Sequence, residues 1–203
     1  MRDLFDRSVR WTLPLLLYAF LGSTAVLAQE LPLGAQMPMA DQSLANASGG
    51  QAALSGLRGE RGTVVVFWSN QCPWIDKYAD RVTSLAGDFE GQGVSVVLVN
   101  SNDAEAYPQE SLEQSREKGY GVAYLMDPES RLARAFGAER TPHVFVFDPN
   151  NALVYVGTID DSPGDAANVQ KTYLRDALTA LVGGGASAVP QTKAFGCTIK
   201  FKN

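Results

Sequence analysis

The feature that most constrains this chain is an apolar segment, Thr63 to Trp68, followed after three polar residues by Cys72 and Pro73. The segment is β-branched at its start, which indicates a buried strand. Proline is favoured at the first position of a helix, where its missing N–H costs nothing. The sequence therefore predicts a strand, a tight loop and a cysteine at a helix N-terminus, where free backbone N–H groups stabilise a thiolate.

Apolar runs and turn residues predict further elements in the alternating order of an α/β chain. We expect helices over residues 73–89, 108–118, 127–136 and 167–182, and strands over 94–100, 122–126, 143–147 and 153–156. Asp127 is expected as the N-cap of its helix, with Pro128 at the first helical position. A short hairpin is predicted around residues 48–50, and Gly183 to Gly185 is predicted to open a flexible tether.

Several motifs resemble those of the thioredoxin-like superfamily. Phe67-Trp68-x-x-x-Cys72-Pro73 is similar to its active-site loop, and Thr141-Pro142-His143-Val144-Phe145 to its cis-proline strand. Three more motifs resemble the redoxin, or alkyl hydroperoxide reductase/thiol-specific antioxidant-like, subgroup: Cys72-Pro73-x-x-x-x-Tyr78-x-Asp80-Arg81, Gly157-x-Ile159-Asp160-Asp161 and Gly196-Cys197-Thr198-Ile199-Lys200.

This resemblance covers roughly Leu31 to the C-terminus. It implies an α/β, thioredoxin-like fold with a central mixed sheet flanked by helices, an N-terminal extension and a C-terminal tail. It also implies a thiol-based oxidoreductase that acts on a disulfide or a peroxide, with antioxidant activity and Cys72 as the nucleophile. The main rival is a redox-silent thioredoxin-like module that binds peptides or partner proteins along the same groove.

The chain departs from the family in its cysteines. The second cysteine of a dithiol enzyme, three residues after the first, is replaced by Ile75, and Ser69 stands where many members of the subgroup carry an upstream cysteine. No vicinal disulfide can form, so an oxidised Cys72 must be resolved by a distant or external thiol. Cys197 is the other cysteine of the chain, and its tether from Val182 can reach ~50 Å, so we expect Cys197 to fold back over the Cys72 loop as the resolving thiol.

Alternatives stay open for both cysteines. A Cys72–Cys197 disulfide could be a permanent staple of the tail, or Cys197 could be a free, exposed thiol. Cys72 could be a buried, inert cysteine. Its place before Pro73, outside any apolar stripe, instead favours an accessible and reactive thiol.

The resemblance assigns substrate-backbone binding to Thr141 and cis-Pro142. Trp74 is a candidate wall of the substrate groove, with packing in the core or at its rim as the simpler alternative. The alternative is a trans proline that starts an edge strand. Ser69 is expected either to donate a hydrogen bond to the thiolate or to cap the helix that Pro73 begins.

Charged residues near the cis-proline motif and the Gly157 motif have simpler interpretations. Arg140 is a candidate supporting cation for the thiolate. His143 is expected to be a half-exposed strand residue, with a proton shuttle as the alternative. Asp160 and Asp161 are expected to be solvated carboxylates of a turn, with a cation site as the alternative.

The N-terminus predicts export. Arg2, Arg7 and Arg10 precede an apolar run, and Val26-Leu27-Ala28 fits a signal-peptidase site. We therefore expect a signal peptide over 1–28, a redoxin domain over 29–185 and a tail over 186–203. The expected location is periplasmic or secreted, without stable membrane association after cleavage. An uncleaved anchor is the alternative, although the run falls short of the ~20 residues of a spanning helix.

Composition argues against other function classes. The net charge is −5 and no basic run is present, which disfavours nucleic-acid binding. Two cysteines and one histidine, far apart in sequence, make a poor metal site, and no cofactor is expected. The expected partners are a protein thiol or disulfide, or a peroxide, together with an external thiol reductant.

Overall fold

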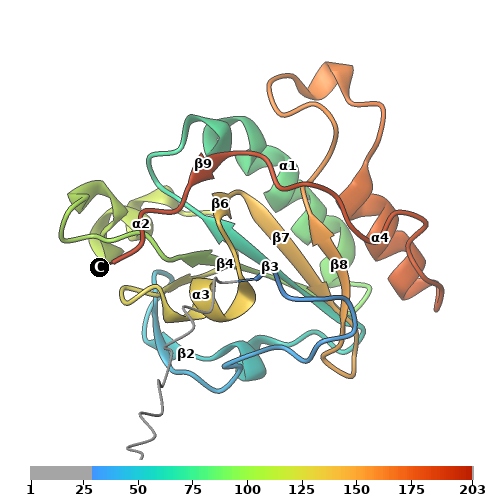
Figure 1. Ribbon diagram of the computed structural model, residues 1–203, viewed down its shortest axis with the longest axis horizontal. Coiled ribbons are helices and arrows are strands. Elements are labelled where there is room, and N and C mark those ends of the chain that lie inside the picture. Colours follow the sequence, from blue (N-terminus) through green and yellow to red (C-terminus); the bar gives the residue numbers. More distant parts are fainter. Residues whose placement is uncertain (1–28, 203) are drawn as a thin grey trace, which may run out of the picture.

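The computed structural model describes residues 29–202, and its centre is a seven-stranded sheet in the order β2-β1-β5-β4-β3-β7-β8 (Figure 1). Its strands are β1 (Leu44–Asn46), β2 (Gln51–Ala52), β3 (Gly62–Trp68), β4 (Val94–Asn100), β5 (Ala123–Met126), β7 (His143–Phe147) and β8 (Leu153–Gly157). β3, β4 and β5 are parallel, whereas β7 runs antiparallel to both β3 and β8. The predicted mixed sheet flanked by helices is confirmed.

Within residues 29–202, four α-helices and three short 3-10 turns accompany these strands. The helices are α1 (Pro73–Glu90), α2 (Leu112–Lys118), α3 (Arg131–Phe136) and α4 (Tyr173–Val182), and the turns are η1 (Leu54–Leu57), η2 (Pro108–Glu110) and η3 (Ala166–Asn168). The predicted helix over 108–118 is split because Ser111 caps α2 and accepts a hydrogen bond from the Gln114 amide. The last helix begins at Tyr173, six residues later than predicted.

The start of α3 also differs from the prediction. Ser130, in the left-handed region, is the N-cap, and Pro128 lies outside the helix. Asp127 still satisfies this helix start, because its carboxylate accepts hydrogen bonds from the Arg131 and Ala133 amides at 3.0 and 3.1 Å. The prediction of Asp127 as the N-cap is therefore wrong in position, although its carboxylate does satisfy amides of the first turn.

The central strand β3 is buried along its whole length. Because successive side chains of a strand point to opposite faces, Val64, Val66 and Trp68 pack in one core with α1 and α4. Val65 and Phe67 pack in the other core with α3 and the N-terminal segment. A strand covered on both faces needs apolar side chains at every position, which explains the unbroken apolar run.

The C-terminal tail leaves α4 and crosses the molecule toward α2, as the red segment of Figure 1 shows. It first lines the edge of β8, where the Val156 amide donates to the Pro190 carbonyl and the Thr192 amide donates to the Val156 carbonyl, both at 3.0 Å. It then forms β9 (Cys197–Thr198), which pairs antiparallel with β6 (Arg140–Thr141). The tail is thus docked along strand edges after its glycine-rich start.

The predicted signal peptide lies outside the described residues. Within residues 29–202, no helix combines the length and the apolar character that a membrane crossing requires.

Candidate active site

Cys72 lies where the sequence places it, between the end of β3 and the start of α1. It is the N-cap of α1, and Pro73 occupies the first turn. The expectation of an accessible thiol is wrong, because the Cys72 side chain is only 3 % exposed. Its Sγ donates a hydrogen bond to the Thr141 carbonyl oxygen at 3.2 Å. The thiol is therefore covered, and the residue before Pro142 supplies part of the cover.

The Thr141–Pro142 peptide bond is cis, as the motif predicts. In the two-stranded pairing of β6 with β9, Cys197 is directly opposite Thr141. The same residue thus contacts Cys72 through its carbonyl and faces Cys197 across the ladder. Both cysteines are free thiols. The fold brings together two cysteines that are far apart in the chain.

Cys197 is partly exposed, and its thiol is held in the protonated form. Burial, a hydrogen bond with Cys72 and the electrostatic influence of the nearby Cys72 sulfur raise the pKa of Cys197 to about 12, and Lys200 opposes the shift. At neutral pH Cys197 is consequently a thiol that must lose its proton before it can attack a sulfur atom.

Glu110 lies beneath the loop that precedes Cys72, and sequence reasoning did not find it. It ends η2, and its side chain is only 2 % exposed. Its carboxylate accepts hydrogen bonds from Ser69 Oγ at 2.6 Å, the Asn70 amide at 2.8 Å, Asn100 Nδ2 at 2.8 Å and the Gln71 amide at 3.3 Å. In the sequence Glu110 looks like any acid of a polar helix, so no local signal marks it.

Ser69 acts as the link between Glu110 and Cys72. Because its hydroxyl donates to Glu110, its proton is not directed at the Cys72 sulfur. Its Oγ accepts hydrogen bonds from the Gln71 and Cys72 amides, both at 3.2 Å. Ser69 therefore neither donates to the Cys72 sulfur nor caps α1, which has no side-chain cap, and instead braces the loop before the helix.

Arg140 is exposed and contacts the tail rather than Cys72. Its Nη1 donates to Thr198 Oγ1 at 3.1 Å and to the Gly196 carbonyl at 3.5 Å. The structure therefore places this predicted supporting cation at the β6–β9 ladder, where it holds the strand that carries Cys197.

Trp74 is half-buried and meets an aromatic residue of the tail. Its ring packs edge-on against Phe195, with centroids 4.8 Å apart. The two rings line a cavity of about 450 Å³ together with Tyr173, Asp160 and Lys193. The predicted groove residue thus borders an open space, one wall of which comes from the tail.

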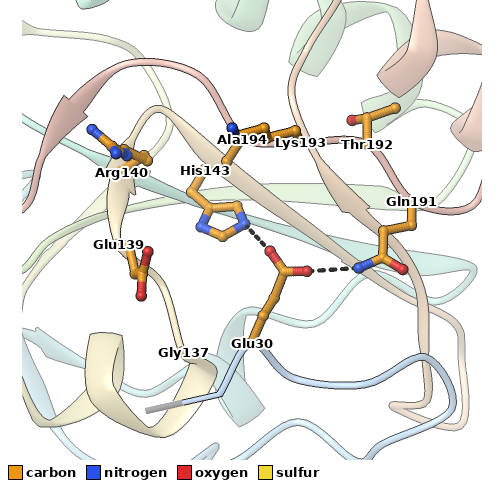
Figure 2. Close-up of a pocket in the computed structure, with 9 residues that line it drawn as sticks. All are labelled: Glu30, Gly137, Glu139, Arg140, His143, Gln191, Thr192, Lys193 and Ala194. Carbon is orange, nitrogen blue, oxygen red and sulfur yellow. Dashed lines mark hydrogen bonds and ion pairs between the residues drawn. The ribbon is translucent and has the colours of Figure 1, made fainter. Parts of the chain in front are cut away.

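His143 is buried, at 2 % exposure, and not half-exposed as expected. Its Nε2 lies 3.0 Å from a carboxylate oxygen of Glu30, and Gln191 donates to the other oxygen at 2.8 Å (Figure 2). The hydrogen bond with His143 lowers the pKa of Glu30, against an opposing effect of burial. This cluster joins the N-terminal segment, β7 and the tail beside a cavity of about 510 Å³.

The expectation of a solvated Asp160 is also wrong. Asp160 is 5 % exposed and pairs with Arg81 Nη1 at 2.6 Å and with the Tyr78 hydroxyl at 3.1 Å. Asp161 is exposed and accepts hydrogen bonds from the Gln170 and Lys171 amides. Two motifs of the redoxin resemblance therefore meet in an ion pair between α1 and the segment after β8. Over the described part of the chain, no three His, Cys, Asp or Glu residues are grouped to hold a metal ion.

Comparisons with known proteins find relatives that share the sequence and the overall fold of this chain. A hypothetical protein from Sinorhizobium meliloti is 35 % identical, with a TM-score of 0.78 over 86 % of this chain and 97 % of its own. An uncharacterised conserved protein from Geobacillus kaustophilus is 36 % identical, with a TM-score of 0.79 over 84 % of this chain and 93 % of its own. The thiol-disulfide oxidoreductase ResA of Halalkalibacterium halodurans is 28 % identical in an alignment of 133 residues that covers 59 % of this chain and 72 % of ResA.

The model of the AhpC/TSA family matches residues 33–156, from the N-terminal segment through β8. This range includes the Cys72 loop, Glu110 and cis-Pro142, and it ends before the tail. The chain belongs to the AhpC/TSA family.

Proposed function

We propose that this chain is a thiol-based oxidoreductase that uses Cys72 as its nucleophile and Cys197 as its resolving thiol. The observation that carries the proposal is the pairing of β9 with β6. It sets Cys197 opposite Thr141, whose carbonyl oxygen accepts the Cys72 hydrogen bond. The similarity to a thiol-disulfide oxidoreductase supports the same chemistry.

With a disulfide substrate, the Cys72 thiolate attacks one sulfur and forms a mixed disulfide, and the other half leaves as a thiol. With a peroxide, Cys72 becomes a sulfenic acid and the peroxide leaves as an alcohol or water. Cys197 then attacks the Cys72 sulfur and releases the substrate thiol or water. An external thiol reductant, as the partner of the reaction, reduces the Cys72–Cys197 disulfide and returns both thiols.

The docked tail also limits which substrates can reach the site. The predicted peptide-binding edge at Thr141 is occupied by β9, and Phe195 covers part of Trp74. An extended protein chain must displace β9 before it can pair with Thr141. A peroxide or a small disulfide needs a smaller opening, so the closed tail favours these substrates and disfavours the redox-silent peptide-binding module.

Turnover of a hydroperoxide and of a small disulfide tests this proposal on wild type, Cys72→Ser and Cys197→Ser. Cys72→Ser should lose turnover of both substrates. Cys197→Ser should still react once and then accumulate the sulfenic acid or mixed disulfide at Cys72, visible by mass spectrometry. Retained turnover in Cys72→Ser would overturn the proposal. If the Cys72–Cys197 disulfide of wild type stays intact in mild reductant while the protein turns over substrate, the disulfide is a structural staple.

We further propose that the protein is exported, on the strength of its N-terminal sequence. An exported protein meets oxidising conditions in which a disulfide persists. Cell fractionation with N-terminal sequencing tests this, and the expected mature chain begins at Gln29. A cytosolic chain that retains Met1 would contradict it.

A further inference from the structure

We propose that Glu110 is a positioning residue for Cys72, because its buried carboxylate fixes the loop that aims the Cys72 thiol at the β6–β9 ladder. This inference rests on the proposed role of Cys72 as the reacting thiol. It adds a residue outside the cysteines and the cis-proline segment to the working parts of the site.

The first observation is that Glu110 gathers hydrogen-bond donors almost entirely from one loop. Three of its four donors belong to the consecutive residues Ser69, Asn70 and Gln71, and the fourth is Asn100 at the end of β4. A carboxylate that is 2 % exposed is costly to bury unless such donors surround it. Glu110 thus replaces solvent for this loop and gives it one preferred shape.

The second observation is the direct path from Glu110 to the cysteine. Ser69 Oγ donates to Glu110 and accepts from the Cys72 amide at 3.2 Å. With its amide tied on this side, Cys72 directs its Sγ to the Thr141 carbonyl on the other. The Glu110–Ser69–Cys72 chain of hydrogen bonds therefore controls where the sulfur lies relative to Cys197.

The Asn70 side chain ties the loop to its surroundings a second time. Asn70 Nδ2 donates to the Gln109 carbonyl at 2.9 Å and to Ser115 Oγ at 2.8 Å, and its Oδ1 accepts from the Tyr124 hydroxyl at 3.0 Å. The loop and the segment that carries Glu110 are thus bound to each other in both directions. A loop fixed in this way does not need a second cysteine nearby to place the first.

The test compares Glu110→Gln and Ser69→Ala with Glu113→Gln, an exposed acid of α2 that serves as the matched control. Ser69→Ala keeps the Glu110 charge and its three other donors, so it separates positioning from charge and remains informative if Glu110→Gln folds poorly. Two quantities are measured without substrate: the rate of Cys72 alkylation by iodoacetamide, and the glutathione concentration that half-reduces the Cys72–Cys197 disulfide.

A loosened loop uncovers Cys72 and aims it less well, so the two quantities should move in opposite directions. We expect alkylation of Cys72 about tenfold faster, and half-reduction at about tenfold less glutathione, in both site variants; a tenfold change is what the loss of one charge-assisted hydrogen bond produces. Glu113→Gln should leave both quantities within about twofold of wild type.

Three results would overturn the positioning role: folded variants with both quantities unchanged, an effect in Glu110→Gln with none in Ser69→Ala, or an equal effect in Glu113→Gln. If wild type forms no Cys72–Cys197 disulfide in glutathione buffers, the resolving role of Cys197 fails. The alkylation rates then still decide whether Glu110 positions Cys72.

Discussion

Cys72 and Cys197 both lie beside Thr141, but different parts of the fold hold them there. Cys72 is placed by a buried strand before it, a helix after it and a loop anchored on the buried Glu110. Cys197 belongs to the two-residue strand β9. The position of β9 depends on its pairing with β6, which is far away in the sequence. The first sulfur is fixed by the core, and the second is fixed by the docking of the tail.

This difference suggests how the site changes during a reaction. Moving Cys72 means disturbing β3 or α1, which carry much of the core. Moving Cys197 means releasing short contacts at strand edges, and such contacts open at lower free energy than a core. We therefore expect Cys197 to move toward Cys72 when the disulfide forms. Variants that disturb the docking of the tail one contact at a time, and leave the Cys72 loop unchanged in sequence, test this expectation.

The largest effect is expected from Ile199→Ala. Ile199 follows β9, is 3 % exposed and packs in the core that contains α3. Removing its branched side chain should weaken tail docking by about 2–5 kcal/mol, the usual cost of such a truncation. Cys72 should then be alkylated faster, and the Cys72–Cys197 disulfide should be easier to reduce.

Val189→Ala is the control for this variant, because Val189 lies in the same tail and is 43 % exposed. It should change neither quantity. If Ile199→Ala also leaves both unchanged, the tail does not depend on its buried anchor and the contrast between the two cysteines fails.

Gly196→Ala is expected to lower stability less than Ile199→Ala does, but to change how closely the tail approaches Thr141. Gly196 has φ 149°, and a Cβ there would overlap the Thr141 carbonyl, the oxygen that accepts the Cys72 hydrogen bond. The strand must shift away from β6, so disulfide formation should slow while overall stability falls by about 1–3 kcal/mol.

Gly184→Ala is the matched control, since Gly184 also has a positive φ, 76°, but has open space around its Cβ position. It shares the backbone strain without the overlap. Disulfide formation with excess oxidant, followed by stopped flow, should therefore be slower in the Gly196 variant and unchanged in the Gly184 variant. Equal rates in the two would show that close approach of the tail to Thr141 is unimportant.

The same contrast explains what the sequence could predict. The strand, loop and helix around Cys72 follow from local signals, namely an apolar run, polar residues and Pro73, and all are confirmed. The burial of Cys72, His143 and Asp160 was missed because each is covered or paired by residues far along the chain, such as Glu30 for His143 and Arg81 for Asp160. Hydrophobic periodicity does not report such pairings.

Glu110 shows the same limit for the site itself. Nothing in a run of polar residues distinguishes it from Glu113 or Glu117, which are exposed. Its role comes from the turn η2, which directs its carboxylate beneath the loop before Cys72. The reach of the tail and a return of Cys197 to the Cys72 loop could be proposed from the sequence. The strand edges on which the tail docks could not, because backbone pairing at β6 and β8 depends little on side-chain identity.

The smallest predicted effect concerns pH and the Glu30 carboxylate, which accepts a hydrogen bond from Gln191 of the tail. Glu30 contacts His143 and Gln191, and the hydrogen bond with His143 lowers its pKa below the ordinary value of 4.5. A carboxyl with a lowered pKa in the folded state stabilises the fold above the unfolded pKa, and this contribution disappears as the pH falls through the folded pKa. Glu30→Gln should therefore lower the free energy of unfolding by about 1 kcal/mol or less near neutral pH, since the side chain is 31 % exposed.

As the pH falls below 4.5 and through the lowered pKa of Glu30, the difference between wild type and Glu30→Gln should shrink toward zero, and urea unfolding at several pH values measures it. Glu139→Gln, an exposed acid beside the same cavity, is the control and should change neither the stability nor its pH dependence. If Glu30 anchors the tail through Gln191, acid should also speed the alkylation of Cys197 relative to Cys72 when both are measured against unfolded chain at the same pH. A constant ratio of the two rates would mean that the tail stays docked without this carboxylate, and that strand pairing alone keeps Cys197 in place.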